Sequence, residues 1–109
     1  MTYRADYPAI EPERAIIDAM KGVVVLEFGA PWCGHCHAAQ PLLRAWLAEA
    51  GDDVTHLKVE DGKGRPLGRS FGVKLWPTVI VLENGRELAR AVRPTRPSDL
   101  ELVNEALGA

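Results

Sequence analysis

The two cysteines of this 109-residue chain, Cys33 and Cys36, are separated only by Gly34 and His35. A disulfide between residues this close in sequence would link no distant segments, so the pair is poorly suited to a purely structural purpose. Two neighbouring thiols can instead exchange with a disulfide of another molecule, and the thiolate is the attacking species. The spacing therefore predicts redox chemistry at sulfur.

The segment around the pair should favour a thiolate at Cys33. An apolar strand is expected over residues 23–28 and helical spacing follows the pair, so Cys33 lies where a strand ends and a helix begins. The free N–H groups and the positive dipole end of a helix stabilise an anion there. We expect Cys33 to be the nucleophile and Cys36, one turn later, to face inward and attack second. A charged His35 would stabilise the thiolate further.

Helices and strands are expected to alternate along the chain. The first half predicts a helix from Pro12 to Gly22 with Ala15, Ile16, Ala19 and Met20 on its apolar face, a strand over 23–28, a helix to Gly51 kinked at Pro41, and a strand over 55–59. The second half predicts a short helix over 66–71, strands over 79–82 and 88–92 joined by an Asn84-Gly85 turn, and a last helix opened by a capping box over 98–101. Residues 1–10 receive no element.

The order of these elements predicts the architecture. The run over 23–28 is continuously apolar apart from Glu27, which is typical of a central strand buried on both faces. Early strand–helix–strand units indicate parallel strands, and the late hairpin indicates antiparallel ones. We therefore expect a mixed sheet with helices on both faces.

The segment VLEFGAPWCGHC at residues 25–36 resembles the active-site segment of the thioredoxin superfamily, and its Gly-His dipeptide is similar to that of protein disulfide isomerase domains. Trp76-Pro77-Thr78 resembles the family's cis-proline loop, and Asn84-Gly85 and Pro41 resemble its hairpin and its helix-kinking proline. The resemblance covers roughly residues 10–107. It implies one thioredoxin-like domain over 1–109, an α/β fold with a central mixed β-sheet flanked by helices on both faces.

The resemblance also implies roles for individual residues. Cys33 would attack a protein disulfide, Cys36 would resolve the mixed disulfide, and Glu27 would take the proton from the resolving thiol. Burial in an apolar strand favours the protonated form of an acid, which suits Glu27 to proton transfer near neutral pH. The catalytic set is completed by His35. The residues expected to bind substrate, around a cis-Pro77 loop, are Trp32, Trp76, Pro77, Thr78 and Arg93.

Four positions depart from the thioredoxin pattern. Gly29 stands where thioredoxins commonly have a second tryptophan, and His56 aligns with a buried lysine near the acid. Trp76 precedes the cis-proline in place of an aliphatic residue, and Arg93 follows the last strand in place of a glycine. Taken alone, His56 is interpreted as a solvated strand residue, and Trp76 as a substrate contact rather than a packing residue.

Composition restricts the partners. The net charge of −2, with both signs mixed along the chain, gives no reason to expect nucleic acid or an anionic membrane as a partner. The longest apolar run is far shorter than a membrane span, and the N-terminus shows no signal-peptide pattern, so a cytoplasmic location is expected. We expect a monomer without a cofactor that acts on protein disulfides, with a thioredoxin-reductase-like electron donor.

Three alternatives accompany this interpretation. Cys33 to His37 matches the Cys-x-x-Cys-His pattern of haem attachment, but that reading leaves the α/β pattern unexplained. Cys33, Cys36, His37 and His56 could supply zinc ligands, although no second Cys-x-x-Cys motif is present. Lastly, a thioredoxin fold can serve as a binding module or redox switch for a dedicated partner. The intact cysteines, together with Glu27 and Pro77, favour the enzyme.

Overall fold

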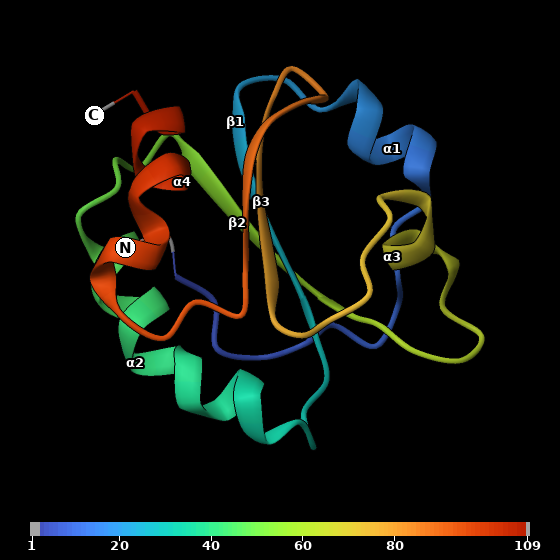
Figure 1. The fold of residues 1–109 in the computed structure, drawn as a ribbon. Coiled ribbons are helices and arrows are strands. Elements are labelled where there is room, and N and C mark those ends of the chain that lie inside the picture. Colours follow the sequence, from blue (N-terminus) through green and yellow to red (C-terminus); the bar gives the residue numbers. More distant parts are fainter. Residues whose placement is uncertain (1–2, 109) are drawn as a thin grey trace.

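The computed structural model describes residues 3–108, and they form a four-stranded sheet with helices on both faces (Figure 1). The elements in chain order are α1 (Arg14–Ala19), β1 (Val23–Gly29), α2 (Gly34–Ala48), β2 (Val54–Glu60), α3 (Pro66–Ser70), β3 (Thr78–Glu83), β4 (Arg86–Val92), the 3₁₀ turn η1 (Pro97–Leu100) and α4 (Glu101–Ala106). Met1, Thr2 and Ala109 lie outside the described residues. No helix within residues 3–108 is long and apolar enough to cross a membrane.

The sheet is mixed, as predicted, with strand order β2-β1-β3-β4. β1 and β2 are parallel, and the other neighbouring strands are antiparallel. The continuously apolar β1 lies between two neighbours and is buried on both faces, which confirms its predicted central position. The hairpin between β3 and β4 also forms, with φ values of 50° at Asn84 and 81° at Gly85. These left-handed conformations explain the Asn-Gly pair.

Each face of the sheet carries its own core. One core lies under α1 and α3 and includes Ile17, Val24, Leu26, Phe28, Val59, Leu67, Phe71, Val73, Ile80 and Leu82. The other lies under α2 and α4 and includes Val25, Ala39, Leu43, Leu47, Val54, Val79, Val81, Ala91, Leu100 and Val103. Figure 1 shows the helix pairs on opposite sides of the sheet seen edge-on. Alternate residues of β1 point into different cores, so Glu27 shares a face with Val25.

The helix α1 corrects one prediction. Ile17 is fully buried in the core, whereas Ile16, which was expected on the apolar face, is 59% exposed. The helix is only six residues long and begins at Arg14, so Pro12 precedes it instead of standing in its first turn. The apolar residues over 15–20 fit more than one helical face, and only the packing against β1 and β3 selects Ile17.

The predicted capping box over residues 98–101 is also wrong. The turn η1 begins at Pro97 with Arg96 as its N-cap, and Asp99 occupies the third position of the turn. The Asp99 carboxylate accepts hydrogen bonds from the backbone N–H groups of Thr95 and Arg96 at 2.9 and 3.2 Å. Because Pro97 suits a first-turn position, the turn starts before Ser98 can cap it. The helix α4 continues from η1 at Glu101.

Candidate active site at the two cysteines

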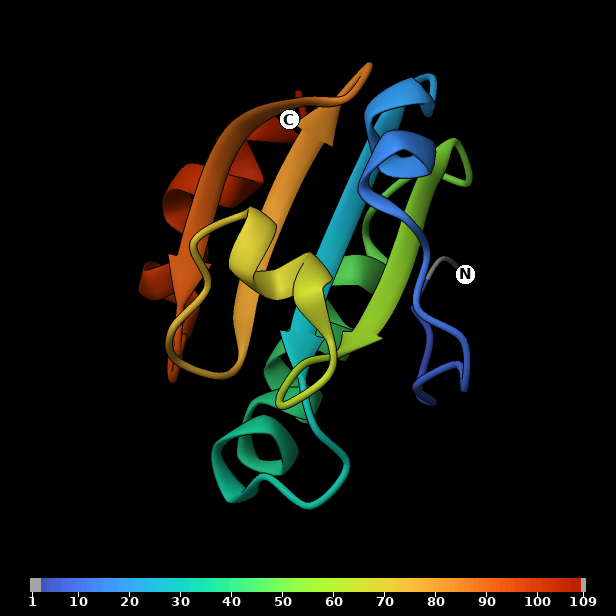
Figure 2. The same ribbon diagram turned by 90° about the vertical axis from the view of Figure 1, so that its right-hand side faces the viewer.

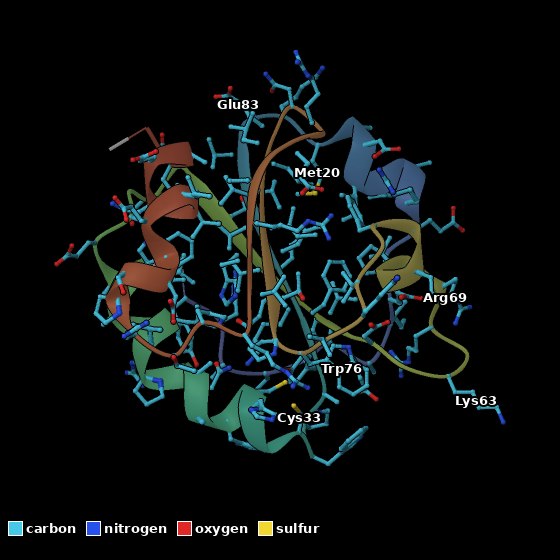
Figure 3. The ribbon with its side chains drawn as sticks, in the orientation of Figure 1. Met20, Cys33, Lys63, Arg69, Trp76 and Glu83 are labelled. Atoms are coloured by element: carbon cyan, nitrogen blue, oxygen red, sulfur yellow. The ribbon has the colours of Figure 1, made fainter. Side chains whose placement is uncertain are left out.

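The two cysteines lie at the carboxyl end of β1, where the chain enters α2. Figure 3 shows Cys33 and Trp76 at the same end of the molecule, with Met20 and Glu83 at the opposite end. The loop between α3 and β3 therefore brings Trp76 and Pro77 to the cysteines from a distant part of the sequence. This end of the sheet is where open α/β folds place their sites.

Both thiols are free and buried, with exposed fractions of 6% for Cys33 and 2% for Cys36. Cys33 is the N-cap residue of α2, and the backbone N–H of Cys36 donates to the Cys33 sulfur at 3.2 Å. A helix N-terminus with an N–H group directed at sulfur stabilises a thiolate. Cys33 is the more exposed of the two cysteines, as predicted, although the difference is small.

The Cys36 thiol is held in its protonated form. Burial, followed by the adjacent Cys33 sulfur, raises the pKa of Cys36 from 9.0 to about 11. At neutral pH, attack by Cys36 therefore requires that a proton acceptor remove its proton.

Glu27 is fully buried and lies in a hydrogen-bonded network. Gln40 Nε2 donates to Glu27 Oε2 at 2.8 Å, and His56 Nε2 lies 2.9 Å from Glu27 Oε1. The Arg4 backbone N–H donates to His56 Nδ1 at 2.8 Å, which leaves the ring proton on Nε2 to be donated to Glu27. Within residues 3–108, no hydrogen bond joins Glu27 to either cysteine sulfur.

His56 is buried, so its interpretation as a solvated strand residue was wrong. The expectation that His56 stands in place of a buried lysine beside the acid was also wrong, because Lys58 is itself buried beside Glu27. Lys58 pairs with Glu27 in the β1–β2 register, and its Nζ atom lies 3.7 Å from Glu27 Oε2. Lys58 Nζ also donates to Gln40 Oε1 at 3.0 Å. The alternation over residues 55–59 predicted that His56 and Lys58 share a face, but not that this face is covered.

The surface beside the cysteines is aromatic. Trp32 is 73% exposed and meets Trp76 edge to face with ring centroids 5.4 Å apart. Trp76 Nε1 donates to Asp61 Oδ2 at 2.8 Å, which fixes the Trp76 ring. The peptide bond between Trp76 and Pro77 is cis, as predicted. The Thr78 side chain is buried, and its hydroxyl donates to the Leu75 carbonyl, so it supports the loop from within.

Arg93 and His35 border the same loop on its other side. Arg93 has a φ of 48°, and its Nε atom donates to the Trp76 carbonyl at 2.7 Å. Its backbone N–H donates to the Pro77 carbonyl at 2.8 Å. A cavity of about 110 Å³ is lined by His35, Ala39, Pro77 and Arg93 among others. The His35 side chain is exposed, and no hydrogen bond between it and Cys33 is found in the described part of the chain.

The two histidines of the zinc alternative are engaged elsewhere. His37 Nε2 hydrogen-bonds to the Pro31 carbonyl, and both ring nitrogens of His56 are used as described above. No group of three or more metal-ligating side chains is found within residues 3–108. The structure therefore offers no set of ligands at the cysteines.

Sequence reasoning missed the contribution of Gln40 and of the N-terminal segment. Gln40 donates to Glu27 and to the Cys36 carbonyl, and it accepts a hydrogen bond from the Tyr3 hydroxyl. Residues 3–7 pack against β2 and the start of α2, with Tyr7 close to Cys36. No spacing pattern in the sequence indicates these long-range contacts.

Comparison with known proteins agrees with this geometry. The family model for thioredoxin matches residues 12–104. Thioredoxin of Bacillus subtilis is 33% identical over 92 residues, which cover 83% of this chain and 88% of that protein. Protein disulfide-isomerase A2 of Homo sapiens is 38% identical over 87 residues, covering 77% of this chain but 16% of that protein.

The fold agrees as well. The reduced form of thioredoxin 2 from Pseudomonas aeruginosa superposes with a TM-score of 0.83 at 52% sequence identity, covering 96% of each chain. The family match, the relatives and the fold thus coincide with the paired cysteines at the end of β1. The chain belongs to the thioredoxin family of disulfide oxidoreductases.

Proposed function

We propose that the protein exchanges disulfides with other proteins through a cycle in which Cys33 attacks and Cys36 resolves. The Cys33 thiolate attacks one substrate sulfur, forms a mixed disulfide and releases the other substrate sulfur as a thiolate. The deprotonated Cys36 then attacks the Cys33 sulfur, which forms the Cys33–Cys36 bond and breaks the bond to the substrate. The observation that carries this proposal is Cys33 at the N-cap of α2 with an N–H group on its sulfur.

Glu27 is proposed as the acceptor of the Cys36 proton. Its support is a buried carboxylate on the face of β1 that also faces α2, held by Gln40 and His56. Gln40 contacts both Glu27 and the Cys36 carbonyl, so it connects the acid to the turn that carries the thiol. The Cys36 proton would reach Glu27 through solvent, because no direct hydrogen bond joins the two side chains in the part of the chain that the structure describes.

The substrate is proposed to lie as an extended segment along the Trp76–Pro77 loop. Trp32 and Trp76 would cover its apolar side chains, and the exposed side of Arg93 would meet polar ones. Thr78 is buried beneath the loop and would contribute to substrate binding by holding the loop in place.

The exposed His35 is proposed to raise the reduction potential of the Cys33–Cys36 pair through its charge.

We also propose that a thioredoxin-reductase-like donor reduces the Cys33–Cys36 disulfide, since the match to thioredoxin covers 88% of that protein and the match to protein disulfide-isomerase A2 covers 16%. The likeness to protein disulfide-isomerases supports exchange in either direction. The cytoplasmic location and the monomeric state remain predictions.

The test is a pair of cysteine variants in the insulin reduction assay with dithiothreitol. Cys33→Ser should abolish activity, because the attacking sulfur is gone. Cys36→Ser should keep the first attack and accumulate mixed disulfides, visible on non-reducing gels. Trp46→Phe, a change at the distant α2–α4 contact, is the matched control and should remain active. If Cys33→Ser retains activity, or Cys36→Ser traps no substrate, the chain is better described as a binding module.

A further inference from the structure

The N-terminal segment 3–7 closes one side of the site. It runs beside β2 (Figure 2), and polar contacts hold it there. The Tyr3 hydroxyl donates to Gln40 Oε1 at 2.6 Å, and Lys58 Nζ donates to the Ala5 carbonyl at 2.9 Å. The Lys58 ammonium also lies 4.5 Å from the centre of the Tyr7 ring. These contacts fix the direction in which Tyr7 points.

Tyr7 points toward the resolving thiol, and Gly29 makes room for it. A β-carbon at Gly29 would stand 2.6 Å from the Cys36 sulfur and 2.6 Å from the Tyr7 hydroxyl oxygen. Any side chain at this position would therefore displace both groups. The missing side chain at Gly29 lets the hydroxyl and the sulfur occupy neighbouring positions at the end of β1.

The Tyr7 hydroxyl makes no other hydrogen bond within residues 3–108. Its oxygen is buried and has no hydrogen-bond partner of good geometry within residues 3–108. A buried hydroxyl without a partner costs free energy, so such a group calls for an explanation. The sulfur across Gly29 supplies one, because a thiolate there would accept the hydroxyl proton in a hydrogen bond.

The protonation state of Tyr7 restricts its chemistry. Burial, followed by the charge of Glu27, raises the pKa of Tyr7 well above its ordinary value. Tyr7 therefore keeps its proton at every working pH and can donate a hydrogen bond, but it cannot take the Cys36 proton. The Tyr7 hydroxyl also acts on Cys36: it lowers the pKa of the Cys36 thiol, whereas burial raises that pKa.

We propose that the Tyr7 hydroxyl donates a hydrogen bond to the Cys36 sulfur as the thiolate forms and attacks the mixed disulfide. This inference rests on the proposed resolving role of Cys36. The Cys36 proton leaves to Glu27 or to solvent in the cavity of about 350 Å³ lined by Tyr7, Cys36, Gln40 and Lys58 among others. The thiolate then bonds to the Cys33 sulfur, the substrate sulfur departs with the electron pair of the broken bond, and Tyr7 remains protonated throughout.

The test follows both halves of the cycle with 5,5′-dithiobis(2-nitrobenzoate) in a stopped-flow instrument. Attack by Cys33 on this disulfide releases one coloured thiolate at a rate that depends on reagent concentration. Resolution by Cys36 releases the second at a rate that does not. The comparison is between the wild-type protein and Tyr7→Phe, each taken by pH jump to final values from pH 7 to pH 12, a range that includes the raised pKa of Cys36.

Tyr7→Phe should slow the second phase about tenfold near neutral pH, the size expected for a hydrogen bond to a charged group. The pH midpoint of that phase should move up by about one pH unit, and the first phase should be unchanged. Glu13→Gln, at an exposed position away from this cavity, is the matched control and should match the wild type in both phases. Circular dichroism and urea unfolding verify that each variant is folded.

Gly29→Ala is a second, independent variant, because its β-carbon would separate the two groups while leaving Tyr7 in the chain. It should also slow the second phase and shift its midpoint upward. The proposal is overturned if Tyr7→Phe leaves the second phase unchanged, or slows it equally at all pH values, as loss of packing would. A second phase that persists in Cys36→Ser would instead refute the proposed resolving role.

Discussion

The two faces of the sheet differ in what β1 places on them. Toward α1 and α3, β1 presents Val24, Leu26 and Phe28, which belong to a cluster of buried hydrophobic residues and include no ionisable side chain. Toward α2 and α4, it presents Val25 and the fully buried Glu27. On this second face, His56 and Lys58 of the neighbouring strand are buried beside the acid.

The contrast indicates a division between stability and chemistry. An apolar face gains free energy from burial and imposes no condition on protonation. A face with buried ionisable groups gains little net stability, because desolvation offsets the attraction between opposite charges. The fold tolerates the second arrangement where Gln40 joins Glu27 to the Cys36 carbonyl and the Tyr7 hydroxyl lies near the Cys36 sulfur. Variants on the two faces should therefore fail in different ways.

The largest effect on stability is expected on the apolar face. Leu82→Ala removes a side chain that is 1% exposed, and the cavity left behind should lower the free energy of unfolding by about 2–5 kcal/mol. Urea unfolding at pH 7 measures this loss. The rates of both phases with 5,5′-dithiobis(2-nitrobenzoate) should be unchanged at temperatures where the variant is folded. A slowed second phase in the folded variant would contradict the division between the faces.

Glu27→Gln should give the opposite result on the polar face. The amide has nearly the shape of the carboxylate, so we expect the variant to fold, but it cannot accept the Cys36 proton. Release of the mixed disulfide should slow about a hundredfold near neutral pH, the lower range for loss of a general base. The deficit should shrink as the pH rises, because hydroxide can then remove the proton. An unchanged rate from pH 5 to pH 10 would leave Glu27 with a structural role only.

Lys58→Met tests the connection between the polar face and the N-terminal segment. The variant leaves the Ala5 carbonyl without its donor and removes one of the two donors to Gln40 Oε1, so the free energy of unfolding should fall by about 1–3 kcal/mol. Amide hydrogen exchange at Arg4, whose N–H bonds to His56, should become faster. Lys74→Met, at an exposed position, is the matched control. If exchange at Arg4 is equally slow in both variants, Lys58 does not hold the segment.

The smallest effect concerns the reduced protein at alkaline pH. The pKa of Cys36 is raised from 9.0 to about 11, so the unfolded chain releases this proton at lower pH than the folded protein does. The resulting stability is complete below pH 9 and is lost as the pH rises toward 11. Urea unfolding of reduced protein between pH 7 and pH 11 should show this decline, and reduced Cys36→Ser should show a weaker one. Equal declines in both proteins would mean that Cys36 does not contribute.

The sequence by itself determined the framework of the site. The continuously apolar run over 23–28 predicted a central strand, because a strand covered on both faces needs apolar residues at every position. The Asn84-Gly85 pair predicted the hairpin from the left-handed conformations that these residues accept. The cysteines were placed correctly at the junction of a strand and a helix. Each of these conclusions depends on residues that are neighbours in sequence.

The tertiary structure decided which polar residues become part of the site. Alternation along β2 places His56 and Lys58 on one face, but β2 is an edge strand, and what covers that face comes from elsewhere in the chain. Arg4 contacts His56 and Ala5 contacts Lys58 across more than fifty residues of sequence. The position of Tyr7 beside Cys36 depends on these contacts and on the missing side chain at Gly29. Periodicity reports which residues share a face, whereas only packing between distant segments determines whether that face is buried and by what.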